Sequence, residues 1–201
     1  MRRIPIAVAN ERASCGVASF FGSIASCLLV VLMPCAVALG DDWADCNSGR
    51  REDAPRVIKS CSRIIPSAGG EQLKDAHRNR GQAYVTVGKV RLAIEDFTAV
   101  ITMDAEDQAA FQLRGNAYLI QNEADRAIED FEKVIELSQR EDLAYGGYLG
   151  RGQAHELKGQ FDLAIADYKK AVSVHSAQSE AINKRIDMLS QKIGRGGEAR
   201  K

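Results

Sequence analysis

The chain has 201 residues, with 27 basic and 27 acidic side chains and a formal net charge of zero. This balance argues against a nucleic-acid-binding protein, which needs a concentrated basic face. The length suits one ordinary domain, but the segment 1–40 does not have the pattern of such a domain.

Residues 1–40 have the pattern of a secretory signal peptide. Three arginines, at positions 2, 3 and 12, precede an apolar segment over residues 16–39, and the small residues Ala36, Ala38 and Gly40 suit cleavage. We therefore expect an exported protein, periplasmic or extracellular, that begins near Asp41. Since about 20 apolar residues can span a bilayer, an uncleaved anchor formed by residues 16–39 is the alternative. The flanking charges place the remainder on the outer side in either case.

The five cysteines fall into two groups. Cys15, Cys27 and Cys35 lie in the predicted signal, where the preceding proline disfavours lipid modification of Cys35. Cys46 and Cys61 remain, and an even pair in an exported chain predicts a disulfide. The alternatives are two reduced buried thiols or a metal site, although no further cysteine or histidine stands at ligand spacing.

One pattern occurs three times between residues 74 and 178. The segments at 81–84 (GQAY) and 93–97 (AIEDF) recur at 115–118 and 127–131, and a third copy at 152–155 and 164–168 comes slightly later than the same period would place it. Spacings of three and four place the repeated side chains on one helix face, so each copy predicts two helices. The first helices should end near Gly88, Asn122 and Gly159, and the second should cover about 90–101, 125–137 and 162–172.

Each first helix carries an internal glycine at the same place. Because glycine costs a helix about 1 kcal/mol relative to alanine, its recurrence predicts a close crossing of the two helices. We expect the small Ala93, Ala127 or Ala164 to lie opposite it.

These residues resemble the tetratricopeptide-repeat family, whose unit has about 34 residues. The resemblance implies an all-α, right-handed solenoid of antiparallel helix pairs, with units at about 74–107, 108–141 and 145–178. The chain departs from the family pattern in three ways. His77 and His155 replace aromatic residues, Ala105 stands where a proline is expected, and the third copy is preceded by a short insertion within 141–147.

The flanks predict a cap at each end of the array. Residues 41–70 resemble a degenerate unit, with a helix over 56–65, a short partner over 43–46 and Cys61 at the aromatic position, so the disulfide would clamp this cap. Residues 179–193 predict a capping helix, whose apolar stripe is Ile182, Ile186, Leu189 and Ile193. Residues 194–201 predict a disordered tail.

Three arginine–aspartate pairs recur at one constant separation: Arg80 with Asp96, Arg114 with Asp130, and Arg151 with Asp167. We expect each pair to join the two helices of its unit, the alternative being separate solvated charges.

The pattern predicts no enzyme, no metal site and no cofactor. Neighbouring acids such as Glu95 and Asp96 do not face each other on a helix, and His77, His155 and His175 occupy unrelated repeat positions. No phosphate-binding loop, nucleophile elbow or zinc-binding helix motif occurs.

A binding groove is predicted on the first helix of each unit, along the stripe away from the packing face. The expected groove residues are Asp75, Arg78, Gln82 and Val85, then Ala109, Gln112, Asn116 and Leu119, then Gly146, Leu149, Gln153 and Glu156. Solenoids bind extended peptides or partner helices on such surfaces. A clamp for a peptide carboxylate is disfavoured, because beside Arg78 the relevant places hold Gln82, Leu113, Gly146 and Gly150.

The function predicted from these features is a protein–protein interaction adaptor or scaffold of the cell envelope. Its partner would be a protein or peptide, not a nucleic acid, and contact with a membrane would occur only through an uncleaved residue 16–39 segment. One alternative is an enzyme or accessory subunit of an envelope enzyme complex. The other is self-association through Tyr145, Tyr148 and Leu149 beside the glycines 146, 147 and 150.

Overall fold

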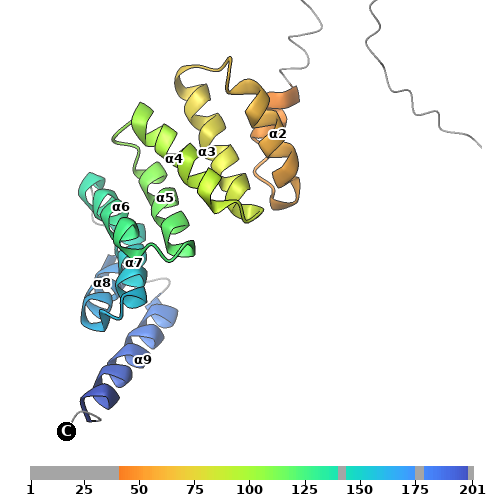
Figure 1. The fold of residues 1–201 in the computed structure, drawn as a ribbon. Helices are drawn as coiled ribbons and strands as arrows, with labels where there is room; N and C mark the ends of the chain where they lie inside the picture. The colour runs from red at the N-terminus through yellow and green to blue at the C-terminus, as the bar shows by residue number, and fades with distance from the viewer. Residues whose placement is uncertain (1–40, 140–143, 175–178, 199–201) are drawn as a thin grey trace, which may run out of the picture.

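The computed structural model describes residues 41–139, 144–174 and 179–198, and this part of the chain is helical without strands. Residues 41–46 form a helical turn, followed by a short 3-10 helix, Arg51–Asp53. The longer helices are α2 (Ala54–Ile64), α3 (Gly70–Thr86), α4 (Val90–Met103), α5 (Gln108–Ile120), α6 (Ala124–Leu137), α7 (Tyr145–Leu157), α8 (Phe161–Val174) and α9 (Ser179–Glu198). They pack as antiparallel pairs that follow one another along an elongated array (Figure 1). The predicted all-α solenoid is confirmed.

The first helix of each unit ends in the same way. Gly88, Asn122 and Gly159 have φ angles of 76°, 59° and 71°, a left-handed conformation that glycine and asparagine adopt more readily than other residues. The following N–H donates back to the carbonyl of the residue five earlier, as in Lys89 N to Tyr84 O at 2.8 Å. This hydrogen-bonded stop satisfies the last carbonyls and turns the chain into the second helix.

The internal glycines do mark a close crossing, and the atoms nearest to them belong to the aromatic rings of the second helices. A Cβ on Gly81 would lie 2.6 Å from Cε1 of Phe97, and one on Gly152 would lie 2.7 Å from Cε1 of Tyr168. Gly115 stands in the same relation to Phe131. Ala93, Ala127 and Ala164 are fully buried one turn before these aromatic residues, and their place opposite the glycines stays a prediction.

Two further glycines bring α7 close to α6. A Cβ on Gly150 would overlap the ring of Phe131, and one on Gly147 would lie 2.7 Å from Cγ1 of Ile135. Tyr148 and Leu149 are partly buried against the cluster under α8 and α9. The residues suggested for self-association therefore pack within the chain itself.

Substitution of Gly150 by alanine is expected to destabilise the fold by about 1–3 kcal/mol, because the new methyl group overlaps the Phe131 ring. In an uncrowded helix the same change stabilises by up to about 1 kcal/mol. Gly194 is the matched control, since a Cβ there has no neighbour within 4 Å. Chemical denaturation should show a lowered midpoint for Gly150→Ala alone, and equal midpoints for both variants would contradict the proposed contact.

The arginine–aspartate pairs join the two helices of each unit, as predicted. Arg114 donates from Nε and Nη2 to the two carboxylate oxygens of Asp130 at 2.9 and 2.7 Å, and the other two pairs repeat this two-bond geometry. The three aspartates are 3–6% exposed, so these are buried pairs and not solvated charges. The hydrogen bonds to Asp130 raise the pKa of Arg114, which therefore stays charged.

The same arginines also connect consecutive units. Nη1 of Arg114 lies 3.1 Å from Oγ1 of Thr98, the residue after the aromatic of the unit before, and Nη1 of Arg80 lies 3.0 Å from Oγ of Ser62. Ser62 follows Cys61 as Thr98 follows Phe97. Cys61 thus stands at the aromatic position of the N-terminal cap.

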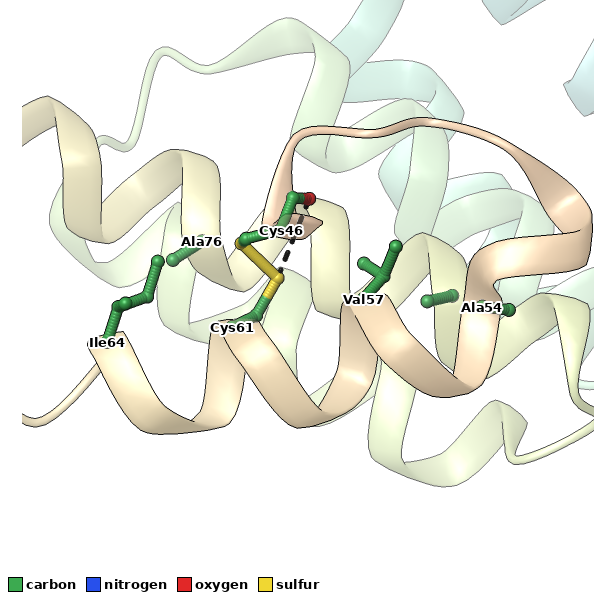
Figure 2. Close-up of a cluster of buried hydrophobic side chains, with 7 residues drawn as sticks. Cys46, Ala54, Val57, Cys61, Ile64 and Ala76 are labelled. Carbon is green, nitrogen blue, oxygen red and sulfur yellow. Dashed lines mark hydrogen bonds between the residues drawn. A yellow bond between two sulfur atoms is a disulfide. The ribbon is translucent and has the colours of Figure 1, made fainter. Parts of the chain in front are cut away.

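The N-terminal cap is held by a disulfide between Cys46 and Cys61, both fully buried. Figure 2 shows Cys61 in the middle of α2, with Val57 and Ala54 on one side and Ile64 on the other, and the chain after Cys46 arching back to the start of α2. Ala76 and Ala83 of α3 complete this cluster. The loop over residues 47–53 is therefore tied at both ends to the array.

At the other end α9 covers the last unit. Ile182, Ile186 and Leu189 are 4–8% exposed and pack on Ala164, Tyr168 and Ala171 of α8. The helix continues to Glu198, so the prediction of a disordered tail from residue 194 is wrong for residues 194–198. Glycine weakens a helix by only about 1 kcal/mol per residue, and extending a formed helix is much easier than starting one.

Several predictions lie outside the described residues: the signal segment 1–40, residues 141–143 of the insertion within 141–147, His175 and residues 199–201.

Candidate partner-binding surface

The first helices α3, α5 and α7 present three exposed amide side chains at equivalent positions. Gln82, Asn116 and Gln153 each follow the packing glycine of their helix. Their side chains form no hydrogen bond with another residue in the described ranges. Each amide can donate and accept hydrogen bonds, and so can pair with either group of a peptide backbone. These three define the amide row.

Other predicted groove residues are engaged inside the protein. Arg78 donates to Asp75 at 2.6 Å and to Asp107 at 2.7 Å, and Asp107 in turn caps α5 by accepting from Ala110 N at 2.9 Å. Arg78 and Asp75 therefore fix the junction between the first two units. This arrangement adds a second argument against a carboxylate clamp, because the one arginine that suited it already has two carboxylates.

Gln112 is also engaged. A Cβ on Gly146 would overlap the Gln112 side-chain amide, which shows that this side chain packs over the backbone of α7. Ala109 stays exposed on α5 but offers only a methyl group. The predicted groove stripe is therefore interrupted in the structure, because the Gln112 side chain packs over α7 in its middle.

The remaining groove residues line two separate hollows. The C-terminal hollow, of about 510 Å³, contains four of them, and helices α8 and α9 supply further walls. The predicted members are Leu119, Leu149, Gln153 and Glu156; the additional ones include Leu157, Tyr168, Ile182 and Arg185.

At the C-terminal hollow the charge of Glu156 is balanced by that of Arg185. Its Oε2 accepts from Nε of Arg185 at 2.9 Å and from the Tyr168 hydroxyl at 3.0 Å, so α7, α8 and α9 are joined at one carboxylate. Burial raises the pKa of Tyr168, and the charge of Glu156 raises it further, so the phenol stays protonated and donates to the carboxylate. The ion pair leaves this hollow without a net charge that could select a ligand.

The N-terminal hollow, of about 330 Å³, lies between the cap and the first two units. Its predicted members are Gln82, Val85 and Asn116. Sequence reasoning missed the wall that the cap supplies, namely Gly49, Arg50 and Arg51, and the rim residues Asn79 and Ile120. The only sequence signal for that wall was the cysteine pair, because Cys46 holds the loop that carries it.

The described residues contain neither a group of three or more His, Cys, Asp or Glu side chains placed to hold a metal, nor a helix long and apolar enough to cross a membrane. The apolar segment 16–39 lies outside the described ranges.

Comparison with known proteins adds three observations. A family model described as tetratricopeptide repeat matches residues 78–142, and a second model with the same description matches residues 145–176. The curated proteins contain no match.

This chain is similar in fold to several solved structures. The chain is 18% identical to MamA MSR-1 C2, with 82% of this chain and 89% of that chain covered and a TM-score of 0.63. It is 19% identical to the first TPR of Spaghetti (RPAP3) bound to an HSP90 peptide, with 62% and 96% covered and a TM-score of 0.57. For the second TPR domain of human RPAP3 in complex with an HSP70 peptide, the identity is 21%, the coverage 57% and 92%, and the TM-score 0.52.

Proposed function

Because the chain belongs to the tetratricopeptide-repeat family, matched over residues 78–142 and 145–176, we propose that it is an adaptor that binds an extended segment of a partner protein along the amide row. The observation that carries this proposal is the row itself. Gln82, Asn116 and Gln153 are exposed at the same position of three successive units and keep their hydrogen-bonding capacity free. The peptide-bound TPR domains of similar fold support this mode of binding.

The proposal favours a peptide over a globular surface. The amide row runs from unit to unit, so an extended chain can meet one amide after another with its backbone groups. The two hollows on either side of the closed middle offer places for side chains. Backbone pairing gives affinity and the hollows give specificity.

We further propose that the adaptor works outside the cytoplasm. The signal-like segment over residues 1–40 and the buried disulfide support this compartment, since disulfides persist in oxidising environments. Cell fractionation, with mass analysis of the purified protein, tests it. A chain that retains residues 1–40 in the cytoplasm, with free thiols at Cys46 and Cys61, would refute the proposed location.

Photo-crosslinking in the producing cell tests the adaptor function. A photoreactive residue at position 82, 116 or 153 should attach the same partner protein from all three sites. The matched controls are Glu95, Glu129 and Ala166, which stand at one equivalent position of the three second helices and are also exposed. Equal products from the row and from the controls, or different products from each row position, would refute binding along the row.

The triple substitution of the amide row by alanine should weaken binding of the crosslinked partner at least about tenfold. Each lost hydrogen bond contributes roughly 0.5–1.5 kcal/mol, and about 1.4 kcal/mol corresponds to a factor of ten. The three positions are exposed, so the fold should keep its stability. Unchanged affinity in a titration of the purified partner would contradict a role for the amides.

A further inference from the structure

The N-terminal hollow is apolar inside and open at its rim. Its walls include Val57 of α2, Val85 of α3, Phe97 of α4 and Leu113 of α5. Ile120, at the end of α5, is 56% exposed beside them. At about 330 Å³ the hollow is at the lower end of the range for ligand pockets, about 300–1,000 Å³, which suits one or two side chains.

The charged residues that line this hollow are both arginines. Arg50 and Arg51 are exposed, and neither forms an ion pair within the described ranges. No carboxylate of the described chain lines the hollow. The next acids along the chain do not neutralise them, since Asp53 lies 3.4 Å from Nη2 of Arg56 and Glu52 is outside the lining.

The C-terminal hollow shows the contrast. There the one arginine in the lining, Arg185, is paired with Glu156. Two hollows on the same surface therefore differ in charge, and the N-terminal one keeps two uncompensated cations beside an apolar interior.

We propose that the N-terminal hollow docks a partner segment in which an apolar side chain stands next to acidic residues. The apolar side chain enters beside Val85 and Ile120, and the carboxylates meet Arg50 and Arg51 at the rim, where guanidinium groups bind carboxylates with two hydrogen bonds. The inference rests on the proposed adaptor function, because it specifies the chemistry of the segment that continues along the amide row.

The disulfide gives this rim its position. Cys46 itself lines the hollow, and Gly49, with a φ angle of 63°, turns the loop that carries the two arginines back toward α2. Asn79 of α3 holds the same loop by donating to Oδ1 of Asn47 at 2.6 Å. A loop anchored in this way presents its arginines with little loss of conformational entropy on binding.

Selection from a randomised library of short displayed peptides tests the proposal on the purified full protein. The peptides retained should combine acidic residues with a large apolar residue, and their binding should weaken with salt. Charge reversal of Arg50 and Arg51 to glutamate should weaken those peptides about tenfold or more. Reversal of Lys169 and Lys170 on α8, which are exposed and make no side-chain ion pair in the described chain, is the matched control with the same change in charge and should have no effect.

Ile120→Asp tests the apolar half of the proposal and should also weaken the selected peptides, whereas Leu163→Asp, at 50% exposure on α8, should not. Retained peptides without acidic enrichment, no retained peptides, or equal binding to the arginine variant and its control would each overturn the inference. The adaptor function would survive such a result if crosslinks from the amide row still captured one partner, so the two failures are distinguishable.

Discussion

Replacement of Cys46 and Cys61 together by alanine is expected to unfold the N-terminal cap while the following units stay folded. A disulfide that closes a loop of about 15 residues stabilises by roughly 3 kcal/mol in the chain-entropy model. Few other interactions can hold the cap together without the disulfide, since residues 41–46 form only a short helical turn against α2. Units of a solenoid contact only their neighbours, so the loss should stay local. Hydrogen exchange should show early opening of α2 (Ala54–Ile64) and unchanged protection in α6.

Two controls make this result specific to the covalent bond. Reduction of the wild-type protein by a thiol reductant should reproduce the exchange pattern of the double alanine variant. Substitution of Asp41 and Lys59 by alanine, both exposed residues of the cap whose side chains form no hydrogen bond or ion pair within the described ranges, should leave α2 protected. If α2 opens equally readily in the wild type and in the double alanine variant, the disulfide is not what holds the cap.

The cap also connects stability to the proposed recognition. Cys46 lines the N-terminal hollow, and the loop behind it carries Arg50 and Arg51. An open cap removes both the charged rim and the Val57 wall. We therefore expect the double alanine variant to lose the acidic peptides of the selection experiment while partners that depend on the amide row alone still bind.

Contacts within one unit could be predicted from the sequence because they repeat with it. The two helices of a unit, the left-handed residue that ends the first of them and the pairs such as Arg114 with Asp130 recur in every unit, and all were observed. A side chain that makes the same contact in three units recurs at the same place in three copies of the sequence. Helix geometry and sequence separation are then sufficient to predict the contact.

Contacts between units could not be predicted in the same way, because they depend on which side chains the neighbouring unit places at the junction. Gln112 lies over α7 only because Gly146 has no side chain there, and Arg78 is occupied because Asp107 caps the next helix. The rim arginines belong to a loop without periodicity, whose path is determined by a covalent bond. The residues that would select the partner therefore lie outside the repeating pattern of the sequence.

Phe131→Ala is expected to be the most damaging single substitution in the array, with a loss of about 3–5 kcal/mol. The ring is fully buried and fills the space left by Gly115 of α5 on one side and Gly150 of α7 on the other, so one side chain connects two units. Native domains are stable by only about 5–15 kcal/mol. Chemical denaturation should therefore show a much lower midpoint, and hydrogen exchange should rise in α5, α6 and α7 together.

Phe97 provides the internal comparison. It is equally buried and faces Gly81 within its own unit, but Leu113 occupies in α5 the place that Gly150 has in α7. Phe97→Ala should thus cost less than Phe131→Ala, because Leu113 can relax into part of the cavity whereas a glycine cannot. Leu163→Ala, at 50% exposure, should stay within about 0.5 kcal/mol of the wild type. If the two phenylalanine variants lose equal stability, the close packing of α7 on α6 does not depend on the Phe131 ring, and the extra glycines of the third unit need another explanation.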